Sequence, residues 1–412
     1  MTRILITNNA LAGRGGSELY VRDLASRLQM RGHQVVAYSS MLGAIADDLR
    51  DLGVPVISDL KSLTEPPDVI HGHHYLDALA AALHFPNVPI VHAVHGWLPW
   101  QEMPLKLPST RRFVAVSALT REHLVTSGID PSRVSIIANF VDMRRIGKLR
   151  QREAPIKRVL LYGNSWTADA PALHLIREAC QRRGLDFQAA GSGLGNEISR
   201  PEDFLPSVDL VFALGRCALE ALACGCAVIV ADRQGIDGVV STDSFPHQRS
   251  ANFGLALIAG KPVTATAVEA ALDKLDIEDS ARVTVIVREV ADIESATDQW
   301  ESLYRLAIAE GAAPLAETIA AASEACLKLK DLLWRLETSH SVMNSRYGDL
   351  STMKQTLDEE VAEKTQQLAE TARQLAEKTR QLDAASSQLK AITHTLSWRV
   401  TAPLRAVRRY LR

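Results

Sequence analysis

The chain contains two stretches in which short apolar runs alternate with amphipathic segments. In the first stretch, an apolar run at 3–9 precedes a segment from Ser17 to Met30 whose leucine and valine positions share one helical face. Strands are expected there at 3–9, 33–40, 68–73, 89–96, 112–117 and 134–142. Strands that alternate with helices predict a parallel, doubly wound α/β sheet.

Residues 143–157 interrupt this pattern with a basic segment of little periodicity, and the pattern then restarts. Strands are expected at 158–165, 186–193, 208–215 and 227–232, with helices between several of them. Two sheets joined by a linker leave a cleft, and the ligands of such sheets bind beyond the carboxyl ends of the strands. We therefore expect two Rossmann-like doubly wound domains, at 1–150 and 151–312.

A seven-residue rhythm replaces this pattern near the C-terminal end. Apolar residues follow steps of four and three from Leu315, and leucines then recur at every seventh position at Leu368, Leu375, Leu382, Leu389 and Leu396. The partner row is small or polar. This pattern predicts a long α-helical coiled coil over 313–396 that joins copies of the chain into a dimer or trimer. A lone surface helix is the alternative.

The last segment, 397–412, mixes arginines with large apolar residues and contains no acidic residue. A short helix from Pro403 would gather its apolar side chains on one side and spread the arginines over the rest. We expect a tail that binds an anionic membrane surface. A solvated basic tail or a nucleic-acid contact is the alternative. The residues assigned to membrane binding are Trp398, Arg399, Arg405, Arg408 and Arg409.

Composition narrows the class of protein. The chain has 412 residues and a formal net charge of −2, which argues against a globally basic nucleic-acid binder. Its five cysteines lack zinc-site spacing and are expected to be reduced thiols. The N-terminus reads as a strand rather than a signal peptide, and no apolar run is long enough to span a bilayer. These features predict a cytoplasmic protein.

The stretch "GRCALEALACGCAVIVAD" (215–232) carries one carboxylate, Glu220, in an apolar helix. If the preceding strand ends at Gly215, the helix begins at Arg216 and turns its first N–H groups toward the cleft, where they suit a phosphate. Glu220 lies one turn further on, on the same side as Arg216 and Cys217. A carboxylate there can accept hydrogen bonds from two ribose hydroxyls, which predicts a nucleotide site.

This stretch resembles the nucleotide-sugar motif of GT-B glycosyltransferases, especially the large retaining group 1, similar to family 4. Three further segments resemble the same family, "GGSELYVRDLASRLQMRGHQVVAYS" (15–39), "FVAVSALTREHLVTSGIDPSRVSIIANFVD" (113–142) and "GSG" (191–193). The resemblance covers roughly residues 3–310. It implies a GT-B fold and a retaining transferase of the hexosyltransferase type that uses a nucleotide-sugar donor without a metal cofactor.

The resemblance also implies roles for particular residues. Glu220 would bind the donor ribose, and His95, at the end of a strand of the first domain, would contact the transferring sugar. Gly15 and Gly16 would lie against the donor phosphate and the acceptor. The residues assigned to catalysis are His95 and Glu220, and those assigned to the donor are Gly15, Gly16, Gly163, Asn164, Gly215, Arg216, Cys217 and Glu220.

The chain departs from the family pattern at three places. The family has two glutamates separated by seven residues, and Phe212 occupies the first of these positions. The basic pair that neutralises the diphosphate is replaced by Asn164 and Ser165, and the usual "NG" is "NF" at 139–140. Departure of the leaving group needs positive charge or hydrogen-bond donors near the β-phosphate. That role would fall to backbone amides or to one of three arginines, Arg14, Arg216 and Arg233.

The tail also resembles the "SWR-T-PLR" segment that follows coiled coils in bacterial surface-polysaccharide assembly proteins. This implies a lipid-linked or growing surface glycan as acceptor, such as O-antigen, capsule or exopolysaccharide, at the inner face of the cytoplasmic membrane. The alternative is a catalytically weak GT-B scaffold or binding protein that organises a polysaccharide assembly complex through its coiled coil. The departures favour the scaffold, whereas Glu220, His95, Gly15 and Gly16 favour the transferase.

Other interpretations are weaker. The loop "GRGG" (13–16) suggests a dinucleotide site, but Glu18 stands where the third glycine belongs. The segment "HGHH" (71–74) could hold a metal, yet adjacent histidines without nearby acidic or cysteine ligands are more typical of a strand end. A nucleotide-sugar epimerase shares the fold, but would have no obvious use for the coiled coil and basic tail.

Overall fold

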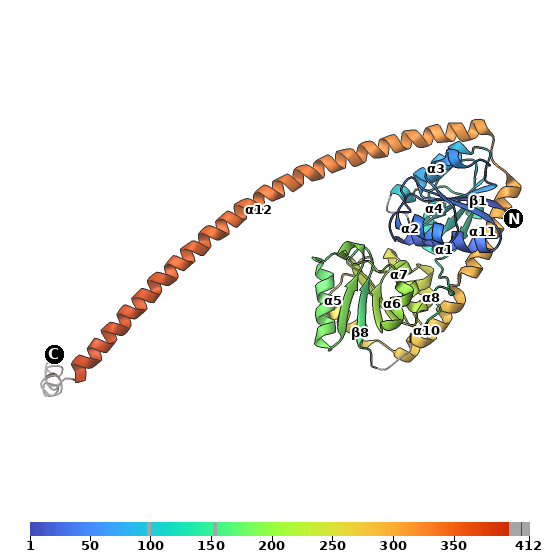
Figure 1. The fold of residues 1–412 in the computed structure, drawn as a ribbon. Coiled ribbons are helices and arrows are strands. Elements are labelled where there is room, and N and C mark those ends of the chain that lie inside the picture. The colour runs from blue at the N-terminus through green and yellow to red at the C-terminus, as the bar shows by residue number, and fades with distance from the viewer. Residues whose placement is uncertain (97–99, 151–154, 395–404, 406–412) are drawn as a thin grey trace. The chain divides into compact units, whose positions relative to one another are not determined.

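The computed structural model describes residues 1–96, 100–150, 155–394 and 405. Among these residues, seven parallel strands form the first sheet (Figure 1). Most of these strands are apolar and buried on both faces, as expected of a parallel sheet covered by helices. Their order across the sheet is β3 (Val56–Ile57), β2 (Gln34–Tyr38), β1 (Arg3–Thr7), β4 (Val69–His73), β5 (Ile90–Val94), β6 (Thr110–Ala115) and β7 (Val134–Ile136).

Helices cover both faces of the first sheet. The helices that follow its strands are α1 (Gly16–Met30), α2 (Ala44–Asp51), α3 (Tyr75–His84) and α4 (Ala118–Thr126). Helices α1 and α2 share one core with α11 (Ile293–Glu310), whose Trp300 and Tyr304 are almost fully buried there. Helix α11 falls within the expected second domain in sequence, but its apolar face packs against the first sheet.

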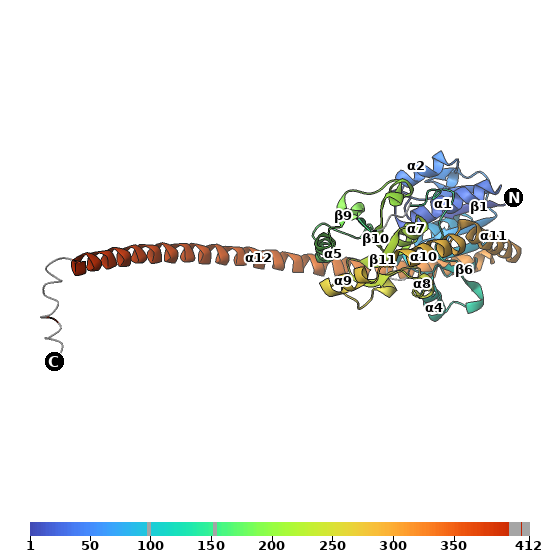
Figure 2. The ribbon, with the colours of Figure 1, turned by 90° about the horizontal axis from the view of Figure 1, so that it is seen from below.

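The described residues of the second sheet form five strands, of which four are parallel and the edge strand β12 is antiparallel. Their order is β12 (Gly235–Val239), β11 (Ala227–Asp232), β10 (Leu210–Ala213), β8 (Arg158–Tyr162) and β9 (Asp186–Ala190). Helices α5 (Pro171–Arg182) and α9 (Ala265–Asp273) lie side by side on one face (Figure 2). Helices α7 (Gly215–Ala223) and α10 (Ile277–Val290) cover the other face, near the short helices α6 (Pro201–Phe204) and α8 (Phe245–Ser250). The expected pair of Rossmann-like sheets is therefore confirmed.

Helix α12 (Leu315–His394) is continuous over 80 residues. Its first turns contact the first domain, where Thr318 is buried and its hydroxyl lies 3.1 Å from that of Ser109. Residues 326–412 form a separate unit. A long helix was predicted here and is confirmed, whereas its pairing into a coiled coil stays a prediction. The leucines of the seam are exposed to between 65% and 71%, at Leu368, Leu375, Leu382 and Leu389.

None of the described helices is long and apolar enough to cross a bilayer. In the tail, Arg405 is the one residue within the described ranges. The membrane-binding assignments at Trp398, Arg399, Arg408 and Arg409 lie outside them.

Candidate active site

A small pocket of about 50 Å³ lies where the carboxyl ends of the strands of the two domains meet. We call it the arginine-lined pocket. The first domain contributes Arg14 and Gly16, and the second contributes Tyr162, Asn164, Arg216, Cys217 and Glu220. Five of the predicted donor residues thus come together, namely Gly16, Asn164, Arg216, Cys217 and Glu220.

Two helices begin at this pocket. Gly15 is the N-cap of α1, and Gly16 is its first residue. Helix α7 begins at Gly215, whose φ of +59° lies in the left-handed region that glycine adopts without strain. Backbone N–H groups at a helix start, together with the positive end of the helix dipole, favour an anion. The pocket therefore combines two helix N-termini with two arginine side chains.

Glu220 is not the lone carboxylate that the sequence suggested. It is 1% exposed, and its Oε1 accepts hydrogen bonds from Arg145 Nη2 at 2.6 Å and from Arg216 Nε at 3.1 Å. Arg145 comes from the linker between the domains and also donates to Glu202 at 2.9 Å. Sequence reasoning missed Arg145 because the linker shows no periodicity that would place it. Its basic character was the only available signal.

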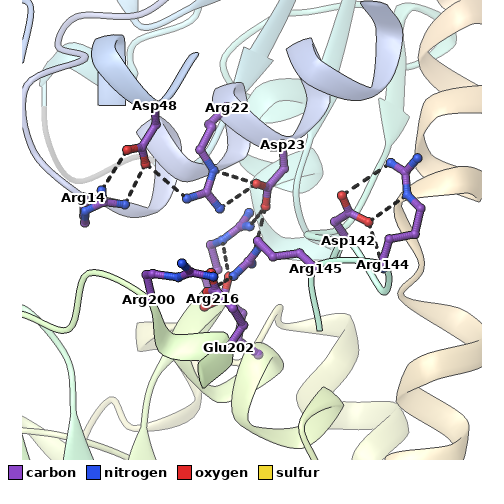
Figure 3. A network of polar contacts seen from close by, with 11 residues as sticks. Arg14, Arg22, Asp23, Asp48, Asp142, Arg144, Arg145, Arg200, Glu202 and Arg216 are labelled. Atoms are coloured by element: carbon purple, nitrogen blue, oxygen red, sulfur yellow. Dashed lines mark hydrogen bonds and ion pairs between the residues drawn. The ribbon is translucent and has the colours of Figure 1, made fainter. Parts of the chain in front are cut away.

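An acidic residue of the first domain completes this network (Figure 3). Asp23, on α1, pairs with Arg216 of α7, accepts from Arg22 at 2.6 Å and lies 3.6 Å from Arg145. Burial alone would raise the pKa of Asp23, but the charges of Arg216, Arg22 and Arg145 outweigh it and lower the pKa to about 2. The carboxylate is therefore ionised at neutral pH and joins the two domains through α1 and α7.

Two buried guanidinium nitrogens of this network have no hydrogen-bond partner among the described residues. They are Arg216 Nη1 and Arg145 Nε. The Arg216 side chain is only 5% exposed and lines the pocket. A buried N–H without a partner is costly, so an occupant that accepts hydrogen bonds would relieve it. An anion such as a phosphate group meets this need.

The loop after β8 is held by neutral hydrogen bonds of the Asn164 side chain rather than by charge. Asn164 Oδ1 accepts from the Ser192 amide at 3.1 Å, and its Nδ2 donates to the Arg14 carbonyl at 3.2 Å. A Cβ at Gly191 would lie 2.0 Å from the Gly163 carbonyl oxygen, so this approach requires glycine. Residues 163–170 contain no lysine or arginine.

Of the arginines considered as replacements for the missing basic pair, Arg14 and Arg216 line the pocket. Arg233 is exposed and outside the described lining of either site pocket.

A second pocket, of about 260 Å³, adjoins the first at the start of α7. We call it the histidine-lined pocket. His95 and Gly215 line it, so these two predicted residues lie beside Arg216 rather than inside the first pocket. Its polar lining includes Ser117, Thr120, Asn139 and Asn252, and its apolar lining includes Val116, Leu119, Leu214 and Leu255.

His95 follows directly after β5, and an acidic side chain fixes its backbone. Its amide donates to Glu102 Oε2 at 2.9 Å, while His74 Nε2 lies 3.3 Å from Glu102 Oε1. Burial lowers the pKa of His95 to about 4; Glu102 opposes this shift, and His74 and Arg216 reinforce it. His95 is therefore neutral at physiological pH.

Phe212 and the "HGHH" segment have structural surroundings. Phe212 is fully buried in the core beneath α5 and α9, so it lies away from the described lining of both pockets. Within the described ranges, no group of three His, Cys, Asp or Glu residues could hold a metal ion. His71 and His73 are instead fully buried in β4.

Comparisons with known proteins agree with this architecture. Residues 14–145 match the family model Glycosyltransferase Family 4. No curated protein sequence matches the chain. A glycosyltransferase from Rickettsia africae ESF-5 is 14% identical, with a TM-score of 0.54 and coverage of 74% of this chain and 99% of that one.

Two further solved structures are similar. Anabaena HepE in complex with UDP and glucose is 15% identical, with a TM-score of 0.53 and coverage of 73% of this chain and 99% of HepE. Sucrose-phosphate synthase from Thermosynechococcus elongatus is 13% identical, with a TM-score of 0.50 and coverage of 75% and 100%. At these identities the likeness shows the fold, which is the GT-B arrangement that the sequence predicted.

Proposed function

We propose that the chain, which has the GT-B fold, is a glycosyltransferase that transfers a sugar from a nucleotide-sugar donor to a lipid-linked or growing surface glycan. The transfer would retain anomeric configuration and occur at the inner face of the cytoplasmic membrane. One observation carries the donor assignment. The buried Arg216 guanidinium has an unpartnered N–H and lines a pocket at the start of α7, beside His95 and Glu220.

The arginine-lined pocket is assigned to the nucleotide. We assign the N-termini of α1 and α7 and the unpartnered Arg216 Nη1 to the diphosphate and to the charge that develops on the leaving group. Arg14, which pairs with Asp48, lies beside them. Both arginine contacts to Glu220 reach Oε1. We therefore assign Oε2 to the ribose hydroxyls. No metal cofactor is required in this proposal, since two helix N-termini and the unpartnered Arg216 Nη1 supply hydrogen-bond donors for the diphosphate.

The histidine-lined pocket is assigned to the transferring sugar and the acceptor hydroxyl. This pocket is lined by Gly215 and His95, which supports its assignment to the groups beyond the proposed diphosphate site. Because His95 is neutral, it can orient a sugar hydroxyl without adding charge. The apolar wall formed by Val116, Leu119 and Leu255 suits an acceptor whose hydroxyl adjoins an apolar group.

A second candidate function is a catalytically weak scaffold, and the burial of Phe212 favours it. A core phenylalanine cannot supply the carboxylate that the family has at this position. In this case the fold would bind partners, and α12 would organise an assembly complex.

The proposal also includes self-association through α12. The exposed leucine row would lose contact with water if it packed against a second copy, and a helix of this length is marginal without a partner. Light scattering of the full chain should show a dimer or trimer. Replacing Leu375 and Leu382 with lysine should give a monomer, whereas lysine at the neighbouring Gln374 and Gln381 should not. A monomer for the full chain would contradict self-association, and a dimer or trimer for all three proteins would contradict the role of the leucine row.

A thermal-shift screen of UDP-, GDP-, dTDP- and CMP-sugars tests the main proposal. A specific donor should raise the melting temperature in proportion to RT ln(1 + [L]/Kd), and should then support sugar transfer. Arg216→Met should remove this stabilisation, whereas Arg233→Met, an exposed arginine outside the pocket, should keep it. Stabilisation without transfer to any acceptor would favour the scaffold. Absence of stabilisation by every nucleotide sugar would contradict the donor site.

A further inference from the structure

Four aromatic rings stack in a column from the core of the first domain to the histidine-lined pocket. Trp300 of α11 stacks on His71 at a centroid distance of 3.9 Å, and His71 stacks on His73 at 4.4 Å. His73 then stacks on His95 at 4.9 Å, with an interplanar angle of 14°. The column therefore connects a buried tryptophan to the residue assigned to the transferring sugar.

Hydrogen bonds join the rings of this column to each other and to their surroundings. His73 Nδ1 lies 2.7 Å from His95 Nε2, and His71 Nδ1 lies 2.6 Å from the Tyr304 hydroxyl. Tyr20 presents its edge to both His73 and His95 and accepts a hydrogen bond from Trp300 Nε1 at 2.8 Å. Burial of a polar ring costs more desolvation free energy than burial of an apolar side chain of similar volume. Packing alone therefore does not account for His71 and His73 at these positions.

The unpaired nitrogens indicate the tautomers of these rings. His73 Nε2 is buried and has no partner among the described residues. A buried N–H without an acceptor is rarer than an acceptor without a donor, so His73 is expected to carry its proton on Nδ1. His73 Nδ1–H then donates to His95 Nε2. Since His95 is neutral, its own proton is left on Nδ1.

From this arrangement we infer that His73 is a positioning residue for sugar transfer, which fixes His95 in the tautomer that carries a proton on Nδ1. His95 then offers a hydrogen-bond donor to an oxygen of the transferring sugar. The inference rests on the proposed function for its consequence in turnover. The charged and titratable neighbours of His95 on other elements are Tyr20, His71, His73, His74, Glu102 and Arg216. Glu102 accepts a hydrogen bond from the backbone amide of His95, whereas His73 contacts the His95 ring and can orient it.

Histidine NMR tests the tautomer in the full chain without requiring activity. Long-range ¹H–¹⁵N spectra of ¹⁵N-histidine-labelled protein, assigned with His95→Gln, should show His95 protonated on Nδ1. His73→Leu should convert this signal to a tautomer mixture, whereas His73→Asn, whose amide can replace the Nδ1 donor, should preserve it. His92→Leu is the matched control, because His92 is also fully buried and its ring packs against Phe113 instead.

The inference is overturned if His95 carries its proton on Nε2, or if His73→Leu leaves its tautomer unchanged.

Steady-state kinetics with the donor found in the screen test the consequence. His73→Leu should lower kcat by roughly 10- to 100-fold, as expected when a group that orients a functional side chain is lost, with little change in donor KM. His73→Asn should restore most of kcat, and His92→Leu should stay within about twofold of the wild type. An inactive His95→Ala beside a fully active His73→Leu would overturn this inference and leave the proposed function intact. If the wild-type chain binds no donor, that result would instead contradict the proposed function.

Discussion

The two halves of the candidate site, one from each domain, bury polar side chains in opposite ways. In the first domain, polar side chains are buried as neutral rings, and burial lowers the pKa values of His71, His73 and His95. In the second domain, Arg216 and Glu220 are equally buried but face opposite charges. A buried group either gives up its charge or finds a partner for it. In the proposed function, the first half would offer neutral hydrogen-bonding groups to a sugar, and the second would offer the hydrogen-bond donors of α7 and Arg216 to a phosphate.

The contrast predicts a strong pH dependence of stability, which is the largest effect expected. Burial lowers the pKa of His92 to about 3 and also lowers those of His71 and His73. Their unfolded pKa is about 6.5, so below this pH the unfolded chain takes up protons that the folded chain cannot. The free energy of unfolding is highest above pH 6.5 and falls as the pH approaches the folded values, and the contribution of His92 to this loss is about 2 kcal/mol at pH 5.

Urea unfolding at pH 7, 6 and 5 measures this loss. The lowered pKa values of Asp23 and Glu102 do not act in this window, because their unfolded values lie below it. His92→Leu should reduce the slope of the free energy of unfolding against pH by the contribution of about one bound proton. A flat profile between pH 7 and 5 would show that the first half is not held by neutral histidines.

The charged half should respond to loss of a partner rather than to pH. Glu220→Ala leaves the Arg145 and Arg216 guanidiniums facing each other without their shared carboxylate, which typically costs about 3–5 kcal/mol. Donor affinity should fall as well. Asp203→Ala, which breaks an exposed ion pair with Arg200, should change stability by less than about 1 kcal/mol. Calorimetric melting of both variants makes the comparison, and similar losses in both would remove the distinction.

Much of the fold followed from the sequence, because its strands are dense apolar runs separated by helical periodicity. Strand β11 was predicted at its observed bounds, 227–232, and β4 was predicted within one residue. The edge strands β3 and β12 were missed, since one has two residues and the other contains two glycines. The packing of α11 on the first sheet depends on tertiary contacts that no local pattern carries.

The site was less predictable than the fold. Gly16, Arg216, Cys217 and Glu220 were expected near one another because the start of a helix after a parallel strand has a defined position. The role of Arg145 depends on the path of an irregular linker, and the contact of His73 with His95 depends on how two neighbouring strands align. The alternation of a strand could have indicated that Phe212 enters the core.

The third expected effect falls on turnover. His95→Ala removes a hydrogen-bonding group from the pocket proposed for the transferring sugar, and we expect kcat to fall by about 10²- to 10³-fold, as for loss of one preorganised donor. Binding of the bare nucleotide should change little, because that pocket is formed around Arg216. His84→Ala, at an exposed histidine, is the control. Wild-type turnover in His95→Ala would make the first half of the site structural only.

The smallest effect per residue is expected in the basic tail, 397–412, which carries arginines without any acidic residue among them. The arginines around Glu220 contact internal carboxylates, whereas the sequence of the tail contains no acidic residue. A basic segment of this composition suits an external anionic surface. Each basic residue near an anionic leaflet contributes about 1 kcal/mol, and copies joined by α12 would add their contributions. The full chain should therefore sediment with vesicles that contain anionic lipid, less so at high salt, and a chain that ends at Thr395 should stay in solution.

The seam variant with lysine at positions 375 and 382 should bind more weakly than the full chain, because a single tail loses the gain from multivalency. Equal recovery of the full and shortened chains would remove the tail from membrane binding. Equal recovery of the seam variant and the full chain would show that one tail suffices.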